Sequence, residues 1–146
     1  MKPAIILVLL LVAGIVAAFL FLRSRVAESG SLAELLPRLV KLKADTNPNA
    51  FLGFCTRDED ALYYVYEGGV FFLDYELTTP EKTGHADAFR KTAAELGFPV
   101  MDTTYGEYPV LRVRAGNSET QAAEVGAEFT QRLFGHGQKT IFEFLP

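Results

Sequence analysis

Residues 3–22 form an uninterrupted apolar run, PAIILVLLLVAGIVAAFLFL, that contains no charged or strongly polar side chain. A helix of about 20 residues is about 30 Å long, which matches the hydrocarbon core of a bilayer. A helix also satisfies its own backbone polar groups, as lipid requires. We therefore predict that residues 1–22 are a transmembrane anchor and that the chain binds the lipid bilayer through residues 3–22.

A cleaved signal peptide is the alternative interpretation of this run. Val16-Ala17-Ala18 has the small side chains of a cleavage site and follows an apolar core of suitable length. Cleavage there would leave a chain that begins with four large apolar side chains, residues 19–22. We therefore favour an uncleaved signal anchor.

Basic residues are distributed unequally around the run. The side chains expected to flank the membrane are Lys2, Arg23, Arg25, Arg38, Lys41 and Lys43, of which only Lys2 precedes the run. Short flanks rich in Lys and Arg stay on the cytoplasmic side. This predicts a single-pass protein of the cell (inner) membrane with its C-terminal domain in the cytoplasm. An extracytoplasmic envelope domain is the alternative, because Lys2 also fits the basic start of a segment that sends its C-terminus outward.

Charge is distributed unevenly along the chain, and this limits the classes of partner that the protein is expected to bind. Residues 1–44 carry six basic and two acidic side chains, whereas residues 45–146 carry eight basic and sixteen acidic ones. An acidic domain is a poor phosphate binder, so we expect no nucleic acid partner. Cys55 is the single cysteine of the chain. An intrachain disulfide is therefore impossible, which fits a cytoplasmic domain.

Residues 23–44 are expected to be a basic juxtamembrane linker followed by an amphipathic helix over about 32–43. Ser31 and Glu34 have the spacing of a capping box, and leucines follow at helical spacing. Pro37 predicts a kink or a restart of this helix. We favour a helix that packs on the core over one that lies on the membrane with its basic side chains at the lipid heads.

Residues 45–146 are expected to form one soluble α+β domain, in which a β-hairpin is the clearest local signal. Strands over 61–67 and 70–77 flank Gly68-Gly69, a pair that supplies the positive φ angles of a tight turn. The predicted pairing sets Tyr66 opposite Phe71, so that one hairpin face is wholly apolar. The other face has more apolar area than solvent contact needs, which predicts a binding surface. Its candidate residues are Tyr63, Val65, Phe72 and Asp74.

The remaining pattern predicts a strand over 50–56, a helix over 85–96, strands over 100–104 and 109–114, a helix from a capping box at Ser118 to about 134, and a strand over 140–145. The resulting order α-β-β-β-α-β-β-α-β indicates a mainly antiparallel sheet with helices packed on it. Up to the last strand, this order resembles that of small secretion-chaperone-like domains. Such domains dimerise and bind partner segments.

Motifs that carry enzyme chemistry do not occur in the sequence, which has no GxGxxG, phosphate loop, HExxH, CxxC or GxSxG. His85 and His136 are the two histidines, and both are expected in loops or helix caps. We therefore predict no catalytic residue, no metal site and no cofactor. The expected function is a protein-binding or homo-oligomerisation module at the membrane. A membrane-tethered enzyme whose site lacks a recognisable motif is the alternative.

Overall fold

A computed structural model describes residues 28–56, 61–137 and 140–145. The elements in chain order are β1 (Glu28–Gly30), η1 (Leu32–Glu34), α2 (Leu35–Ala44), β2 (Leu52–Cys55), β3 (Ala61–Glu67), β4 (Val70–Glu76), α3 (Pro80–Gly84), α4 (Ala86–Leu96), β5 (Met101–Tyr105), β6 (Tyr108–Gly116), α5 (Glu119–Phe134) and β7 (Phe142–Leu145). The predicted α+β class is confirmed. The predicted anchor lies outside the described residues, as do Lys2, Arg23 and Arg25. Within the described ranges, no helix has the length and apolar character needed to cross a bilayer.

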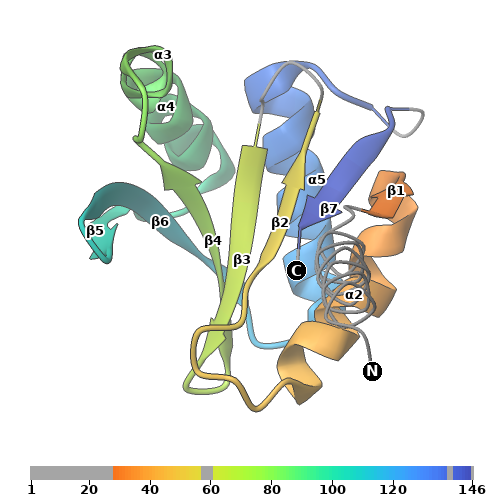
Figure 1. Cartoon of the computed structure of the whole chain (residues 1–146). Coiled ribbons are helices and arrows are strands. Elements are labelled where there is room, and N and C mark those ends of the chain that lie inside the picture. Colours follow the sequence, from red (N-terminus) through yellow and green to blue (C-terminus); the bar gives the residue numbers. More distant parts are fainter. Residues whose placement is uncertain (1–27, 57–60, 138–139, 146) are drawn as a thin grey trace, which may run out of the picture.

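One seven-stranded sheet organises the domain, with the strand order β1-β7-β2-β3-β4-β6-β5 (Figure 1). Each neighbouring pair is antiparallel. The β3–β4 hairpin has the predicted register, with Tyr66 opposite Phe71 and Tyr64 opposite Leu73. Its turn consists of Gly68 and Gly69 at φ angles of 56° and 82°, a backbone conformation that favours glycine.

Helices α2, α4 and α5 cover one face of the sheet, with α5 in contact with both of the others. Alternate strand residues point toward them and form the core, which includes Phe54, Leu62, Tyr64, Phe71, Leu73, Tyr75, Leu111, Val113, Phe142 and Phe144. The fully buried Tyr64 donates a hydrogen bond to the Ala122 carbonyl of α5 at 2.6 Å. A Cβ atom added at Gly126 would collide with the Tyr64 hydroxyl, so this glycine lets α5 lie close to β3.

The start of the first described helix differs from the prediction. Residues Leu32–Glu34 form a 3-10 turn, and α2 begins at Leu35, so that Pro37 falls within the first turn. Amides of a first turn have no intrahelical partner, and proline is tolerated there without a kink. The capping box at Ser31 was wrong, because the Ser31 side chain makes no cap hydrogen bond. The Glu34 carboxylate instead accepts from Arg38, one turn along, at 3.3 Å.

Helix α2 packs on the core, as predicted, with Leu35, Leu39 and Leu42 buried. Two of the basic side chains expected at lipid heads form ion pairs within the domain. Arg38 lies 2.9 Å from the Glu28 carboxylate and over the Phe144 ring, and Lys43 lies 3.1 Å from Glu119. Lys41 is exposed. Because β1 also pairs with β7, the folded unit includes residues 28–44 of the segment expected as linker and helix.

The elements as a whole follow the predicted order, with two additions: β1 at the start and the short helix α3 before α4. The cap at Ser118 is confirmed, since its hydroxyl accepts from the Gln121 amide at 3.2 Å. The Gln121 side chain accepts from the Asn117 amide at 3.3 Å. The chain therefore enters α5 with hydrogen bonds on both sides of the cap residue, which fixes the connection from β6.

Candidate functional site

The second face of the sheet carries the predicted binding residues. Strand alternation and register place the following side chains on it: Phe51, Gly53, Tyr63, Val65, Phe72, Asp74, Glu76, Met101, Thr103, Tyr105, Val110 and Arg112. We call this surface the open face, because none of these residues belongs to the core cluster that contains residues of the described helices. Tyr63, Val65, Phe72 and Asp74 thus share one surface, in which Val65 and Asp74 are buried and Tyr63 and Phe72 are partly exposed.

A pocket of about 90 Å³ lies in the open face. It is lined by Phe51, Tyr63, Val65, Asp74, Glu76 and Tyr105. Three strands, β3, β4 and β6, separate β2 from β5 in the sheet, yet Phe51 beside β2 and Tyr105 on β5 line the same pocket. The sheet is therefore curved, with the open face concave. Figure 1 shows the β5–β6 hairpin turned away from the direction of β2, β3 and β4.

Gly53 positions the aromatic wall of this pocket. It pairs with Tyr63 across β2 and β3, and a Cβ atom at Gly53 would lie 2.9 Å from the Tyr63 ring. The missing side chain thus lets the ring lie against the neighbouring strand. Phe51 contacts the same ring edge-on, with 6.0 Å between ring centroids. An aromatic ring that covers a glycine on the adjacent strand also shields that strand from water.

The polar floor of the pocket is a buried ion pair. Asp74 is 3% exposed, and both of its carboxylate oxygens accept from Arg112, from Nε and from Nη2, at 2.7 Å each. Burial raises the pKa of Asp74, while the hydrogen bond and the charge of Arg112 oppose this effect. The Arg112 guanidinium also reaches Glu67 at 3.3 Å and lies 5.0 Å from the Phe72 ring centre. Phe72 and Asp74 are therefore joined through Arg112.

Glu76 is the second carboxyl group of the pocket. No hydrogen bond or ion pair to its side chain occurs among the described residues. Partial burial is the main cause that raises its pKa, the Asp74 charge adds to it, and the Lys82 charge opposes it. The pKa of the neighbouring Tyr63 is raised to about 12, first by burial and then by the charge of Glu76. The pocket thus combines a phenol that is neutral at pH 7 with a partly desolvated carboxyl group.

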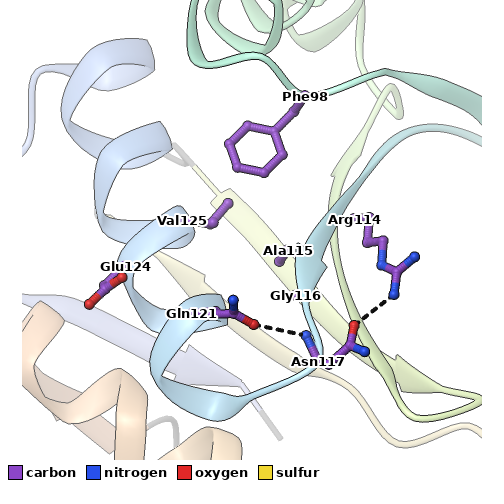
Figure 2. A pocket seen from close by; sticks show the side chains of 8 residues that line it. All are labelled: Phe98, Arg114, Ala115, Gly116, Asn117, Gln121, Glu124 and Val125. Atoms are coloured by element: carbon purple, nitrogen blue, oxygen red, sulfur yellow. Dashed lines mark hydrogen bonds between the residues drawn. The ribbon is translucent and has the colours of Figure 1, made fainter.

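A wider hollow of about 510 Å³ lies where β6 leads into α5 (Figure 2). Its lining residues are Phe98, Arg114, Ala115, Gly116, Asn117, Gln121, Glu124 and Val125. Figure 2 shows that three of its polar residues bond to one another: Arg114 donates to the Asn117 side chain at 2.7 Å, and the Asn117 backbone amide donates to the Gln121 side chain. These groups hold the entry to α5 in place, so we assign the hollow a structural role.

The structure does not bring cysteine and histidine together at a reactive site. Cys55 pairs with Glu143 on the open-face side of β2. His136 lies against the core residue Phe142 on the helix side of the sheet, with 6.0 Å between ring centroids. His85 stands at the start of α4. No three His, Cys, Asp or Glu side chains within the described part of the chain are arranged to hold a metal ion.

Sequence reasoning missed two contributors to the open face. Arg112 falls within the predicted strand over 109–114, but its pairing with Asp74 depends on which strand lies next to β4, and the sequence pattern does not give that neighbour. Phe51 was assigned to a strand without a role. The sequence feature that could have revealed its role is Gly53, two residues later, which pairs with Tyr63 on the next strand.

Comparison of the chain with models of known protein families, with curated proteins and with solved structures finds no match.

Proposed function

We propose that the protein is a single-pass membrane protein whose α+β domain binds another protein, or a second copy of itself, through the open face at the cytoplasmic side of the inner membrane. The observation that carries this proposal is the concave, aromatic open face. Around the pocket, the side chains of Met101, Tyr105 and Tyr108 are 41%, 41% and 55% exposed. Aromatic residues and methionine beside a pocket are typical of the centre of a protein interface.

The size of the pocket favours a protein ligand over a small-molecule substrate. Sites for drug-sized ligands and cofactors enclose about 300–1,000 Å³. The open-face pocket encloses about 90 Å³. A pocket of this size has room for a few waters or for the end of one side chain. A site of this kind suits an anchor residue that projects from a partner surface.

A short tether supports the membrane part of the proposal. Six Cα-to-Cα steps, across the five residues 23–27, separate Leu22, the end of the predicted anchor, from Glu28, the first residue of β1. At an extended length of about 3.4 Å per residue, they span at most about 20 Å. An anchored domain would therefore stay close to the bilayer at its β1 edge. Its acidic surface would be repelled by anionic lipid heads, which leaves the open face available to a protein.

Site-specific photo-crosslinking tests the proposal in cells. A photoreactive phenylalanine analogue replaces Tyr105 in the full-length protein, and a matched variant carries it at Ala94, which is exposed on the outer side of α4. We expect a discrete protein adduct at position 105 and none at position 94. An adduct of twice the chain mass would identify self-association. Absence of any protein adduct at position 105, or equal labelling at both positions, would refute the proposal.

Membrane side is tested separately with two reporters fused after Pro146, one active only inside the cell and the other active only outside it. We expect activity of the inside reporter in the membrane fraction. Activity of the outside reporter would place the domain in the envelope instead. Recovery of the full-length protein in the aqueous fraction without detergent would refute the anchor.

A further inference from the structure

We propose that the open-face pocket receives the side chain of a lysine from the partner protein, with its ammonium group against Glu76 and its aliphatic stem between the rings of Tyr63, Tyr105 and Phe51. This inference rests on the proposed function, because it names the chemistry by which a partner would dock on the open face. It rests on three features of the pocket, an uncommitted carboxylate, aromatic walls and a small volume, and on the acidic composition of residues 45–146.

Glu76 is the carboxylate that can accept a new donor. Arg112 already occupies both oxygens of Asp74, at 2.7 Å each, so Asp74 is committed within the domain. The Glu76 side chain lines the pocket and is partly buried, and no described residue forms an ion pair with it. The Lys82 charge opposes the effect of burial on Glu76 but forms no ion pair with it, so a cation that enters the pocket would relieve the remaining desolvation penalty.

The aromatic walls suit the same kind of ligand. Tyr63 and Phe51 contact each other edge-on, and Tyr105 lines the pocket from β5. The faces of such rings attract a cation by about 0.5–1 kcal/mol at exposed sites and by more where water is excluded. Gly53 holds the Tyr63 ring against β2, so the wall is set before a ligand arrives. Groups of aromatic rings bind quaternary ammonium ligands in other proteins, and this pocket adds a carboxyl group to three such rings.

Lysine fits this pocket better than arginine does. A guanidinium is a broad planar group that binds a carboxylate through two donors, so it needs more room than an ammonium. An ammonium is a compact charge with freely rotating donors, and it needs a single oxygen of Glu76. The volume of about 90 Å³ also suits the narrow end of a lysine side chain.

Long-range charge favours a basic partner as well. Residues 45–146 carry twice as many acidic as basic side chains. Such a surface raises the association rate of a positively charged partner and disfavours an acidic one.

The test uses the full-length protein in detergent micelles with ¹³C-labelled tyrosine rings, observed by NMR. The probes are n-butylammonium, which reproduces a lysine side chain, 1-butanol as its neutral equivalent, and n-propylguanidinium as the arginine equivalent. We expect n-butylammonium to shift the Tyr63 and Tyr105 signals saturably at millimolar concentration. Binding of 1-butanol should be at least about tenfold weaker, because it lacks the charge.

Matched variants assign the effect to Glu76. E76Q removes the pocket carboxylate, and E95Q removes the same charge from an exposed position on α4. We expect E76Q to weaken n-butylammonium binding about tenfold and E95Q to leave it unchanged. A far-UV circular dichroism spectrum like that of the wild type, together with a thermal midpoint no lower than that of the wild type, establishes that E76Q is folded.

Three results would overturn the inference: equal binding by E76Q and E95Q, equal binding of 1-butanol, or tighter binding of n-propylguanidinium. Failure of the inference is separable from failure of the proposed function. A protein adduct at position 105 without n-butylammonium binding would refute the lysine pocket and leave partner binding in place. Binding of n-butylammonium without any adduct would count against the proposed partner.

Discussion

The contact between α5 and the sheet gives the sharpest test of the fold, through the substitution Gly126→Ala. Gly126 is buried, and a Cβ atom there would collide with the Tyr64 hydroxyl and lie 2.8 Å from its Cζ atom. Tyr64 is itself completely buried and donates to the Ala122 carbonyl at 2.6 Å. The extra methyl group must therefore push either the tyrosine ring or the helix out of place.

The expected net effect is a loss of about 2 kcal/mol in the free energy of unfolding. Overpacking of a core typically costs about 1–3 kcal/mol. Loss of the buried tyrosine hydrogen bond adds about 1 kcal/mol. Alanine regains about 1 kcal/mol as a better helix former than glycine. Packing thus outweighs helix propensity, and a domain of this size should lose roughly 6–12 °C in its thermal midpoint.

Thermal unfolding of the full-length protein, followed by circular dichroism, measures this loss. Gly84→Ala is the matched control, since a Cβ atom there meets nothing within 4 Å and the midpoint should stay within about 2 °C. In the Gly126→Ala background, Tyr64→Phe removes the colliding oxygen and should recover part of the loss. An unchanged or raised midpoint for Gly126→Ala would show that helix propensity prevails and that Tyr64 does not lie beneath α5.

Three further predictions concern the open face. Arg112→Ala leaves the buried Asp74 carboxylate unpaired and should lower the free energy of unfolding by about 3 kcal/mol at pH 7, as measured by urea titration. The loss should be smaller at acid pH, where Asp74 is protonated. An equal loss at both pH values would contradict the ion-pair argument. Burial raises the pKa of Glu76 in the folded state, so the wild type gains stability as pH falls through that raised value. E76Q should therefore unfold at a higher temperature than the wild type at pH 7 and lose this advantage as pH approaches 4.5, the ordinary pKa of a glutamate. A lower thermal midpoint for E76Q at pH 7 would contradict this prediction. Gly53→Ala displaces the Tyr63 ring, so it should shift the NMR signals of Tyr63 and weaken n-butylammonium binding several-fold. Unchanged Tyr63 signals would show that the glycine does not position the ring.

Local sequence signals predicted the elements of this fold well where the chain carried a steric or periodic constraint. The Gly68-Gly69 turn fixed the hairpin register because both residues adopt positive φ. The strand β1 was not predicted, since three residues carry no periodicity and its pairing partner, β7, lies at the other end of the chain. The start of α2 was misplaced for a different reason, because the Ser31 signal competes with a 3-10 turn and Glu34 pairs with Arg38 instead.

The candidate site was predictable only as far as the hairpin extends. Alternation along β3 and β4 was enough to place Tyr63, Val65, Phe72 and Asp74 on one face. The pocket also needs Tyr105, which comes from β5 at the sheet edge, and the curvature that brings it near β2. Curvature arises from strand twist summed over the whole sheet, and no local pattern encodes it.

The charged groups of the open face explain how an aromatic surface of this kind could remain selective. An apolar concave sheet face would accept many hydrophobic partners, including other sheets. Here the Asp74–Arg112 pair lies between Phe72 and the pocket, and Glu76 lies within the pocket. A partner without a cation would desolvate Glu76 further and bring no new charge to offset this cost, whereas a lysine would neutralise the carboxylate. The Glu76 carboxylate, which lowers the stability of the free domain, would thus make binding of partners without a cation unfavourable. A protein gains specificity in this way when binding of the wrong partner carries a free-energy cost.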